Sequence, residues 1–330
     1  MNSLPLYPLR FAPIFKDYIW GGRQLADWYP TAPRAGPIAE AWLVSDEAVN
    51  PSVVLEGELR GHTLRELISA EGPRLLGKAQ PHDGRFPVLL KFLDAAAPLS
   101  VQVHPTDRHA AQVTPAARGK SEAWVVLQAT ANSRIFAGLQ PGTTEGRIRE
   151  ALSSGMMVER LHSFTPNVGD CVFLPAGTVH ALGAGLLIFE VQQTSDITYR
   201  LHDWDRVDAK TGKPRPLHID ESLACTNFDF GPCQPVEPER ESPGRERLVD
   251  CEYFRLWRCH AREPIQVGMK DECRILAPIA GAGTVDWDER KFPIRVGDVL
   301  MLPAEVGSCR FVPIGVVTLL EVGLPRCKST

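Results

Sequence analysis

The sequence of 330 residues lacks the paired cysteines that mark small zinc domains and disulfide frameworks. Its eight cysteines stand singly, without any Cys-x-x-Cys spacing. A cysteine-based zinc site needs such pairs, and disulfide frameworks belong mostly to small secreted domains. We therefore expect free thiols that pack as small apolar side chains.

Long apolar runs and an excess of basic charge are also missing. No apolar run approaches the roughly 18 residues of a membrane-spanning helix, and residues 1–22 lack an uninterrupted apolar region followed by a small-residue cleavage site. The net charge is -4, and aromatic residues are not interleaved with basic ones, as nucleic-acid binding would require. These absences predict a cytoplasmic protein that contacts neither membranes nor nucleic acid.

Short apolar runs separated by Gly, Pro and Asp dominate the sequence. Val88–Leu93, Leu186–Val191 and Val316–Val322 are examples, and this pattern is typical of an all-β barrel or sandwich. Helical patterns are local. Thr63 and Thr144 each precede an amphipathic segment as an N-cap residue does. We therefore predict a mainly β protein with a small helical insertion.

An internal repeat indicates two related halves. The segment Gly169–Ala176 is echoed by Gly297–Ala304, and both copies contain a Gly-Asp pair, an apolar run and a Pro-Ala pair. His180 follows the first copy, whereas Ser308 stands at the equivalent place after the second. The second half therefore keeps the framework and lacks the histidine.

The segment 231–247 is rich in proline and charge, with hardly an apolar side chain. Such a composition cannot bury enough surface to form a core, so we expect a linker at about 235–247. The predicted domains are a catalytic one at 1–235, with helical insertions at about 58–80 and 108–165, and a metal-free one at 248–330.

The run Leu99–Asp107 places two metal-binding groups together. Gln102 and His104 are two residues apart in a strand-like segment, so their side chains point to the same face. Glu122 and His180 follow in two further segments. Borderline divalent metals use histidine nitrogen and carboxylate oxygen as ligands in catalytic sites.

The spacing Gly169-x5-Pro175-x-Gly177-x2-His180 matches the second sequence motif of cupins. The segments LSVQVHP, GKSEAW, GDCVFLPAGTVHAL and FEVQQTSDITYRLHDWDR follow in that order. Together with FKDYIWGGRQLADWYP and IAEAW near the N-terminus, they resemble the type I phosphomannose isomerases, in the short bacterial form. The resemblance covers roughly residues 6–228, with a weaker second cupin at 249–323.

The resemblance implies two cupin barrels, of which only the first binds metal. It also implies one Zn²⁺ per chain and the interconversion of mannose 6-phosphate and fructose 6-phosphate through an enediol or enediolate. The partner is then a small sugar phosphate, and we expect a monomer or weak homodimer. The implied metal ligands are Gln102, His104, Glu122 and His180.

Charged and hydroxyl side chains around these ligands are the candidates for the chemistry. Arg200 matches the essential arginine of the family and suits charge stabilisation, because a guanidinium stays protonated. Glu190 is either catalytic or ion-paired in an otherwise apolar strand. The resulting assignment is catalytic for Arg200, Lys120 and Glu190, and substrate-binding for Ser100, Lys91 and Arg206.

Two other functions use similar residues. Two histidines and one carboxylate also describe the non-haem iron site of a cupin oxygenase, although dioxygen chemistry needs neither Gln102 nor a phosphate clamp. A non-catalytic sugar-phosphate binding protein is the second alternative, and the retention of all four ligands argues against it.

Overall fold

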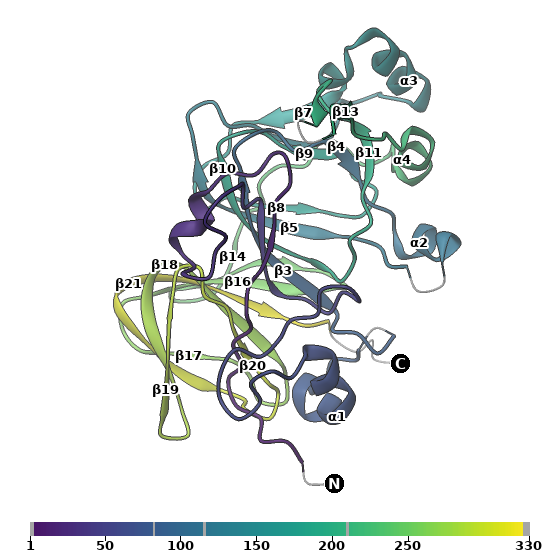
Figure 1. The fold of residues 1–330 in the computed structure, drawn as a ribbon. Coiled ribbons are helices and arrows are strands. Elements are labelled where there is room, and N and C mark those ends of the chain that lie inside the picture. Colours follow the sequence, from purple (N-terminus) through teal and green to yellow (C-terminus); the bar gives the residue numbers. More distant parts are fainter. Residues whose placement is uncertain (1–2, 82, 115–116, 209–210, 326–330) are drawn as a thin grey trace.

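The chain folds into three main antiparallel sheets, in a computed structural model that describes residues 3–81, 83–114, 117–208 and 211–325 (Figure 1). The mainly β prediction is confirmed, and the sheets are compatible with two cupin barrels. The first sheet has the order β1-β2-β3-β10-β5-β8, with strands Ile14–Lys16, Glu40–Val44, Val88–Ala95, Leu186–Gln193, Glu122–Ala129 and Cys171–Leu174.

The second sheet lies in the same half of the molecule as the first. Its order is β11-β4-β9-β6-β7, with strands Tyr199–His202, Val101–Val103, His180–Leu182, Ile135–Leu139 and Leu161–Phe164. A small hairpin, β12 and β13, follows at Val207–Asp208 and Lys213–Pro214.

The third sheet is formed by the C-terminal part of the chain. Its main order is β14-β15-β16-β21-β18-β19, with β17 paired to β21 and β20 paired to β18. In chain order, β14 to β21 are Glu239–Ser242, Arg245–Asp250, Arg255–Ala261, Ile265–Val267, Arg274–Trp287, Arg290–Arg295, Leu300–Leu302 and Cys309–Gly323.

The helices are short and lie at the edges of the sheets (Figure 1). Thr63 caps α1 through a capping box with Glu66, and Thr144 caps α3, as the sequence predicts. None of the described helices has the length and apolar character needed to cross a membrane. The α-helices are Leu64–Leu76, Asp107–Val113, Glu145–Ser154 and Ile219–Cys225, and the 3₁₀ turns η1 and η2 are Gln24–Asp27 and Met157–Arg160.

The region expected as a helical insertion at 108–165 also contains sheet. It holds most of α2 and all of α3, but β5, β6 and β7 lie within it as well. The apolar residues of β5 are buried on both faces of the sheet, which is why this segment is a central strand. The insertion at 58–80 contains α1, as expected.

The prediction of a linker at 235–247 is wrong from Glu239 onward. Strands β14 and β15 occupy this segment, and Glu239 stands opposite Arg247 across the pair. Their side chains form an ion pair, and Arg245 reaches the buried Glu321 at 2.7 Å. Charged side chains thus form an edge of the third sheet by pairing with one another, which composition alone does not reveal. The division into 1–235 and 248–330 remains our proposal.

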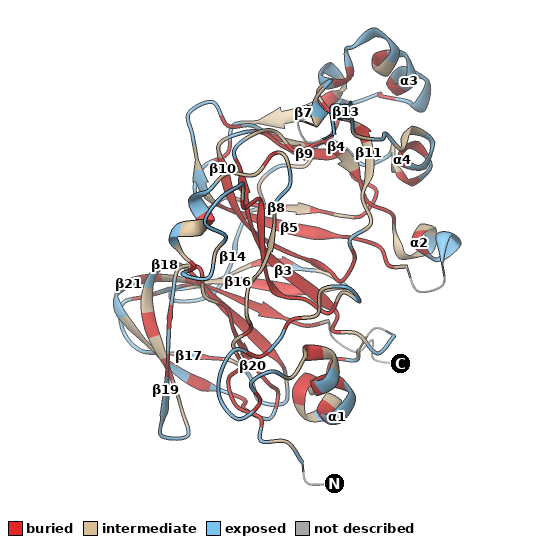
Figure 2. Cartoon of the chain, viewed as in Figure 1, coloured by how far each residue is buried: buried red, intermediate tan, exposed pale blue. Residues whose placement is uncertain are grey.

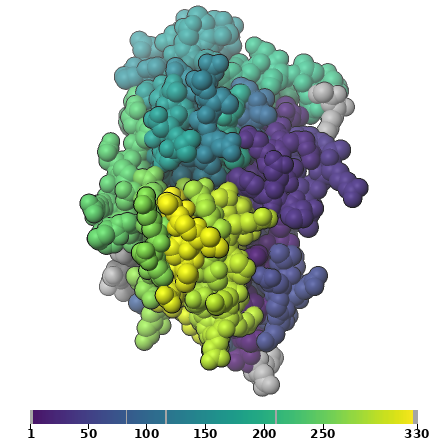
Figure 3. Space-filling view, turned by 90° about the vertical axis from the view of Figure 1, so that its left-hand side faces the viewer, coloured from purple at the N-terminus to yellow at the C-terminus, as the bar shows by residue number. Residues whose placement is uncertain are grey.

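The two halves share one apolar core. The N-terminal segment bridges to the third sheet where the backbone of Leu9 pairs with Met301, and one buried cluster includes residues of both halves. In the space-filling view, the purple N-terminal segment lies against both teal and yellow-green residues (Figure 3). The seven described cysteines are free thiols, and Cys327 lies outside the described residues.

The internal repeat forms the same turn twice. Gly169 and Gly297 both have φ of 93°, a conformation that glycine adopts without strain. In each copy the following aspartate accepts a hydrogen bond from a backbone N–H three residues earlier, at 2.7 Å for Asp170 and 3.0 Å for Asp298. The two copies of the repeat therefore share a turn structure as well as a sequence pattern.

The register of the strands places several polar residues of the first half next to one another in its interior. Across the first sheet, Lys91 stands opposite both Trp42 and Glu190, and Glu190 stands opposite Trp124. All four are buried, and Figure 2 shows β3 and β5 as buried strands. In the second sheet Gln102 stands opposite Arg200 on one side and His180 on the other. The rings of Trp124 and His180 pack edge to face, with centroids 5.4 Å apart. The polar residues of the first sheet therefore lie close to those of the second sheet.

Candidate active site

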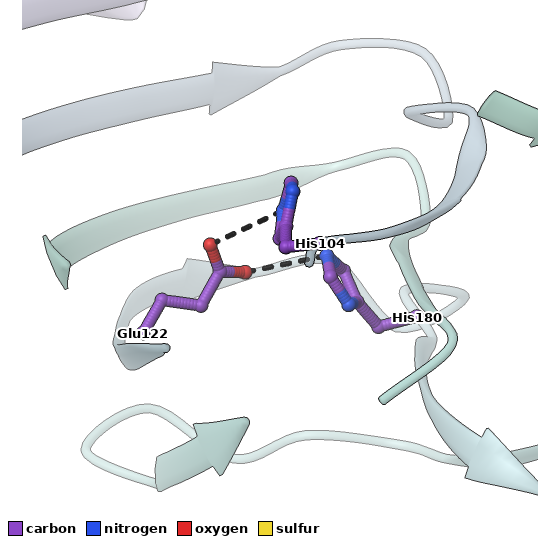
Figure 4. A group of neighbouring side chains, drawn as sticks. All are labelled: His104, Glu122 and His180. Carbon is purple, nitrogen blue, oxygen red and sulfur yellow. Dashed lines mark ion pairs between the residues drawn. The ribbon is translucent and has the colours of Figure 1, made fainter. Parts of the chain in front are cut away.

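His104, which follows β4, meets Glu122 and His180, the first residues of β5 and β9, with potential ligand atoms within 4.8 Å of one another (Figure 4). The Glu122 carboxylate lies between the rings: its Oε2 is 3.5 Å from Nε2 of His104, and its Oε1 is 3.3 Å from Nε2 of His180. Donors about 2.1 Å from a tetrahedral zinc ion are about 3.4 Å apart. The carboxylate and each imidazole therefore have the separation that one such ion requires.

Backbone carbonyls orient both imidazole rings. Nδ1 of His104 lies 2.8 Å from the carbonyl oxygen of Ile197, and Nδ1 of His180 lies 2.9 Å from that of Thr178. Each Nδ1–H donates to its carbonyl, so each Nε2 is unprotonated and can accept. Lys120 Nζ donates to Nε2 of His104 at 3.0 Å, and Nε2 of both rings faces the side of Glu122. Metal-binding histidines are usually held in this way.

The protonation states also suit a cation. Burial, together with the nearby Lys120 ammonium, lowers the pKa of His180 to about 4 and that of His104 well below its usual range. Both rings are therefore neutral near pH 7. Burial raises the pKa of Glu122 against the opposing effect of Lys120, and its Oε1 is a buried acceptor without a hydrogen-bond partner. This unsatisfied oxygen and two neutral imidazoles fit a divalent metal ion.

Gln102 lies beside this cluster. Its amide nitrogen is 3.3 Å from Nε2 of His180, and its Oε1 accepts a hydrogen bond from Ser100 Oγ at 3.3 Å. A half-turn of the amide exchanges its nitrogen and oxygen and directs the oxygen toward the cluster. Gln102 is thus placed to be a fourth ligand, which remains a proposal.

Alternating buried charges extend from the cluster into the first sheet. Lys120 forms an ion pair with Glu122 and lies 3.8 Å from Oε1 of Glu190. Lys91 lies 3.4 Å from Glu190 and 3.5 Å from Glu40. With Glu122 deprotonated, as a metal ligand must be, these five groups contain one carboxylate more than ammonium groups, and a divalent cation would turn their net charge positive.

The lysines keep Glu190 ionised. Burial acts to raise the pKa of Glu190, but Lys120 and Lys91 outweigh it and lower that pKa to about 2. Burial likewise acts to lower the pKa of Lys91, and Glu40 and Glu190 outweigh it and raise that pKa. Trp124 also donates to Glu190 Oε1 at 3.0 Å. Glu190 and Lys91 are therefore a satisfied ion pair that still faces the cavity described next.

A cavity of about 280 Å³ lies next to the cluster of His104, Glu122 and His180. These three residues do not line it; Gln102 and Lys120, which contact the two histidines, form the wall on that side. This volume is near the lower end of the range for ligand pockets, about 300–1,000 Å³, and suits a small polar ligand. The cavity wall contains five of the six residues assigned to catalysis or substrate binding, namely Arg200, Lys120, Glu190, Ser100 and Lys91, together with Gln102.

Arg206 does not lie in this wall. Its guanidinium donates to the carboxylate of Asp203 at 2.5 Å and to the carbonyl of Pro98, so it anchors the chain beneath the cavity. Arg215 takes the place expected of Arg206: it lines the cavity and is held by two hydrogen bonds to Asp203, of 2.8 and 2.5 Å. Arg200 donates to the Pro216 carbonyl at 2.8 Å and keeps a buried Nε without a partner.

Three residues of the wall, Tyr18, Thr198 and Arg215, were not predicted from the sequence. Arg215 follows a hairpin whose length separates it from the motif around Arg200. Sequence spacing does not predict that Arg215 lines the cavity, because its position depends on how the hairpin folds back.

Comparisons with known proteins point to one family. The family model for the catalytic domain of type I phosphomannose isomerase matches residues 9–129. Mannose-6-phosphate isomerase ManA of Bacillus subtilis is 35% identical over 311 residues, which cover 91% of this chain and 94% of that protein. Mannose-6-phosphate isomerase of Streptococcus mutans is 31% identical, with 89% and 91% covered.

A solved structure extends the agreement to the whole fold. The crystal structure of mannose 6-phosphate isomerase from Bacillus subtilis matches with a TM-score of 0.87 and 29% identity, covering 96% of this chain and 99% of that chain. The resemblance seen in the sequence is thereby confirmed: this chain belongs to the type I phosphomannose isomerase family.

Proposed function

We propose that this protein is a zinc-dependent isomerase that interconverts mannose 6-phosphate and fructose 6-phosphate. The observation that carries the proposal is the meeting of His104, Glu122 and His180 beside a cavity walled by lysine and arginine. The activity is the one named for the relatives that match over about nine-tenths of the chain.

The metal would be held by His104, Glu122 and His180, with Gln102 as the fourth protein ligand. When bound, zinc supplies a Lewis acid that stabilises negative charge on the substrate oxygens at C1 and C2. Two neutral imidazoles, one carboxylate and a neutral amide leave that ion about one positive charge. The predominance of neutral ligands therefore favours Lewis-acid chemistry.

The arginines bind the phosphate in this proposal. Arg200 and Arg215 both line the cavity, and arginine presents planar pairs of donors that match phosphate oxygens. Arg200 is only half buried, and burial lowers its pKa without removing its charge near pH 7. Ser100 also lines the cavity. Its hydroxyl, which donates to Oε1 of Gln102, could donate instead to a phosphate or sugar oxygen.

Lys120 and Glu190 transfer the protons in this proposal. Conversion of the aldose to the ketose moves the proton on C2 to C1 and the proton on O2 to O1, through an enediol or enediolate. Lys120 and Glu190 line the cavity and lie 3.8 Å from each other. They are titratable groups within reach of the cluster. Lys91 holds Glu190 from the other side at 3.4 Å and thereby orients it.

A coupled assay tests this function against its rivals. We expect turnover of mannose 6-phosphate, much weaker turnover of unphosphorylated mannose, and no oxygen uptake with either sugar. Oxygen uptake would favour the cupin oxygenase, and sugar-phosphate binding without turnover by zinc-loaded protein would favour the non-catalytic binding protein.

A further inference from the structure

Asp203 and Arg215 form an ion pair with two hydrogen bonds beside the cavity. Nε and Nη2 of Arg215 donate to Oδ2 and Oδ1 of Asp203 at 2.8 and 2.5 Å. Asp203 is buried, whereas Arg215 lines the cavity. Because both bonds approach one edge of the guanidinium, the hydrogens between Nη1 and Nη2 can serve a second acceptor. That second edge matches two oxygens of a phosphate.

The carboxylate of Asp203 is shared by two arginines. Arg206 donates to the same Oδ1 at 2.5 Å. Burial acts to raise the pKa of Asp203, but the hydrogen bonds from Arg215 and Arg206 outweigh burial and lower that pKa. Asp203 is therefore ionised near pH 7, and the group of three keeps one positive charge that can attract a phosphate.

An unusual turn holds Asp203 in place. The N–H of Arg206 donates to the Asp203 carbonyl at 3.1 Å and closes the turn. Trp204 and Asp205, at the centre of the turn, have φ of 57° and 53°. Residues other than glycine seldom adopt this left-handed conformation, and such residues cluster at functional sites. The turn therefore has a conformation that its surroundings must maintain.

The turn is fastened to the segment that leads into β4. Nε1 of Trp204 donates to the Leu99 carbonyl at 2.5 Å, and the Arg206 guanidinium donates to the Pro98 carbonyl. Ser100, the next residue of that segment, lines the cavity. The carboxylate carried by the turn thus has a fixed place relative to the cavity wall.

The backbone next to Arg215 is fixed separately, by β11. The guanidinium of Arg200 donates to the Pro216 carbonyl at 2.8 Å. The N–H of Arg200 donates to Nδ1 of His218 at 3.2 Å, and the N–H of His218 donates to the Arg200 carbonyl at 2.7 Å. The position of the Arg215 backbone therefore depends on β11, whereas the direction of its guanidinium depends on Asp203.

We infer that Asp203 is a positioning residue for phosphate recognition, because it aims the guanidinium of Arg215 at the phosphate of the substrate. Asp203 is not part of the cavity wall, so it acts through Arg215. The inference rests on the proposed function and deepens it: it names the pair of residues that selects a phosphorylated sugar over a free one.

Binding of mannitol 6-phosphate provides the test, because this compound carries the phosphate but has no carbonyl group to isomerise. Its dissociation constant is measured by calorimetry for the wild type, Asp203→Asn, Arg215→Ala and the double variant, beside KM and kcat for mannose 6-phosphate and the unfolding midpoint. Asp46→Asn is the matched control. Asp46 is also buried and accepts from Nε of Arg65 at 2.8 and 3.0 Å, but it lies outside the cavity wall.

We expect Asp203→Asn to weaken binding of mannitol 6-phosphate by about 10-fold, the equivalent of one weakened charge-assisted hydrogen bond. KM for mannose 6-phosphate should rise by a similar factor, with little change in kcat. When Arg215 is already alanine, Asp203→Asn should weaken binding no further, because its effect passes through Arg215. Asp46→Asn should lower the unfolding midpoint and leave the affinity unchanged.

A second variant tests the same role without changing Asp203, in case Asp203→Asn does not fold. Arg215→Lys keeps the positive charge but loses the paired contact with the carboxylate. We expect it to weaken binding of mannitol 6-phosphate by about 10-fold as well. Wild-type affinity in Arg215→Lys would overturn the inference.

Unchanged affinity in a folded Asp203→Asn variant would also overturn it, as would a wild type that does not bind mannitol 6-phosphate. A loss that persists when Arg215 is alanine, or an equal loss in Asp46→Asn, would show a general structural effect and contradict the positioning role. The isomerase proposal is judged separately by turnover of mannose 6-phosphate in the wild type. Binding that depends on Asp203 without any turnover would support the inference and reject the isomerase.

Discussion

Nδ1 of His104 lies 2.8 Å from the carbonyl oxygen of Ile197, which stands two residues before β11, the strand that contains Arg200. This hydrogen bond joins the end of β4 to the start of β11 and turns Nε2 of His104 toward Glu122. One backbone carbonyl thereby sets the tautomer of a candidate metal ligand and fixes the segment that leads to the proposed substrate cavity.

Replacement of His104 should abolish metal binding without unfolding the protein. We expect His104→Ala to weaken zinc binding by at least about 100-fold, more than the loss of an outer partner would, and to reduce turnover of mannose 6-phosphate to the level of the chelated enzyme. His162→Ala is the control, because His162 contacts Gln234 near the surface. Metal content by elemental analysis distinguishes the two variants; retention of one zinc ion by His104→Ala would contradict the assignment.

The two arginines near Asp203 should differ in their effects. We expect Arg215→Ala to raise KM for mannose 6-phosphate by about 10- to 100-fold, the equivalent of one lost charge-assisted hydrogen bond, with a smaller change in kcat. Arg206→Ala should chiefly lower the unfolding midpoint, because its guanidinium binds the Asp203 carboxylate and the Pro98 carbonyl. Steady-state kinetics beside thermal unfolding separate these effects. A larger KM change in Arg206→Ala would return the phosphate-binding role to Arg206.

The buried carboxylate of Glu190 should stabilise the fold in a pH-dependent way. Its pKa is lowered from 4.5 to about 2, because Lys120 and Lys91 outweigh the effect of burial. Stability from a lowered carboxyl pKa is fully present above the unfolded value and is lost as pH falls toward the folded value. Glu190→Gln should therefore lower the free energy of unfolding by about 3–5 kcal/mol near pH 7, and the difference should shrink between pH 5 and pH 3.

Urea unfolding at several pH values measures this difference. Glu305→Gln, which removes an exposed partner of Arg74, is the control and should cost less than about 1 kcal/mol. A difference for Glu190→Gln that stays constant down to pH 3 would contradict the lowered pKa.

Two glycines with the same backbone conformation should separate folding from metal binding. Gly177 and Gly297 both have φ of 93°, so alanine should cost about 1–2 kcal/mol of stability at either position. Only Gly177→Ala should also weaken zinc binding, because its N–H donates to the His104 carbonyl at 2.9 Å and the next residue holds His180. Zinc affinity measured in both variants checks this, and an equal loss in the two would contradict it.

Much of this site could be predicted because its residues lie at fixed spacings within strands. Gln102 and His104 share one face by alternation, and the turn at Gly169–Gly177 delivers His180 to the same place. Lys91 and Glu190 were conspicuous as single charges in apolar strands, and the register places them opposite each other. The sequence left open whether Glu190 is ion-paired or catalytic. These roles do not exclude each other, because Glu190 pairs with Lys91 and also lines the cavity.

The rest depended on contacts that local sequence does not encode. Arg206 and Arg215 share Asp203, and which of them faces the cavity is decided by the hairpin between them. The strands β14 and β15 were hidden because charged side chains pair across an edge and need no apolar pattern.

The most direct test is the turnover of mannose 6-phosphate by chelated protein during titration with Zn²⁺. The proposed mechanism predicts no turnover at the start, a rise in proportion to bound zinc, and a plateau at about one ion per chain, as expected for a single group of two histidines and a carboxylate. Full turnover by protein shown to be free of metal would contradict it.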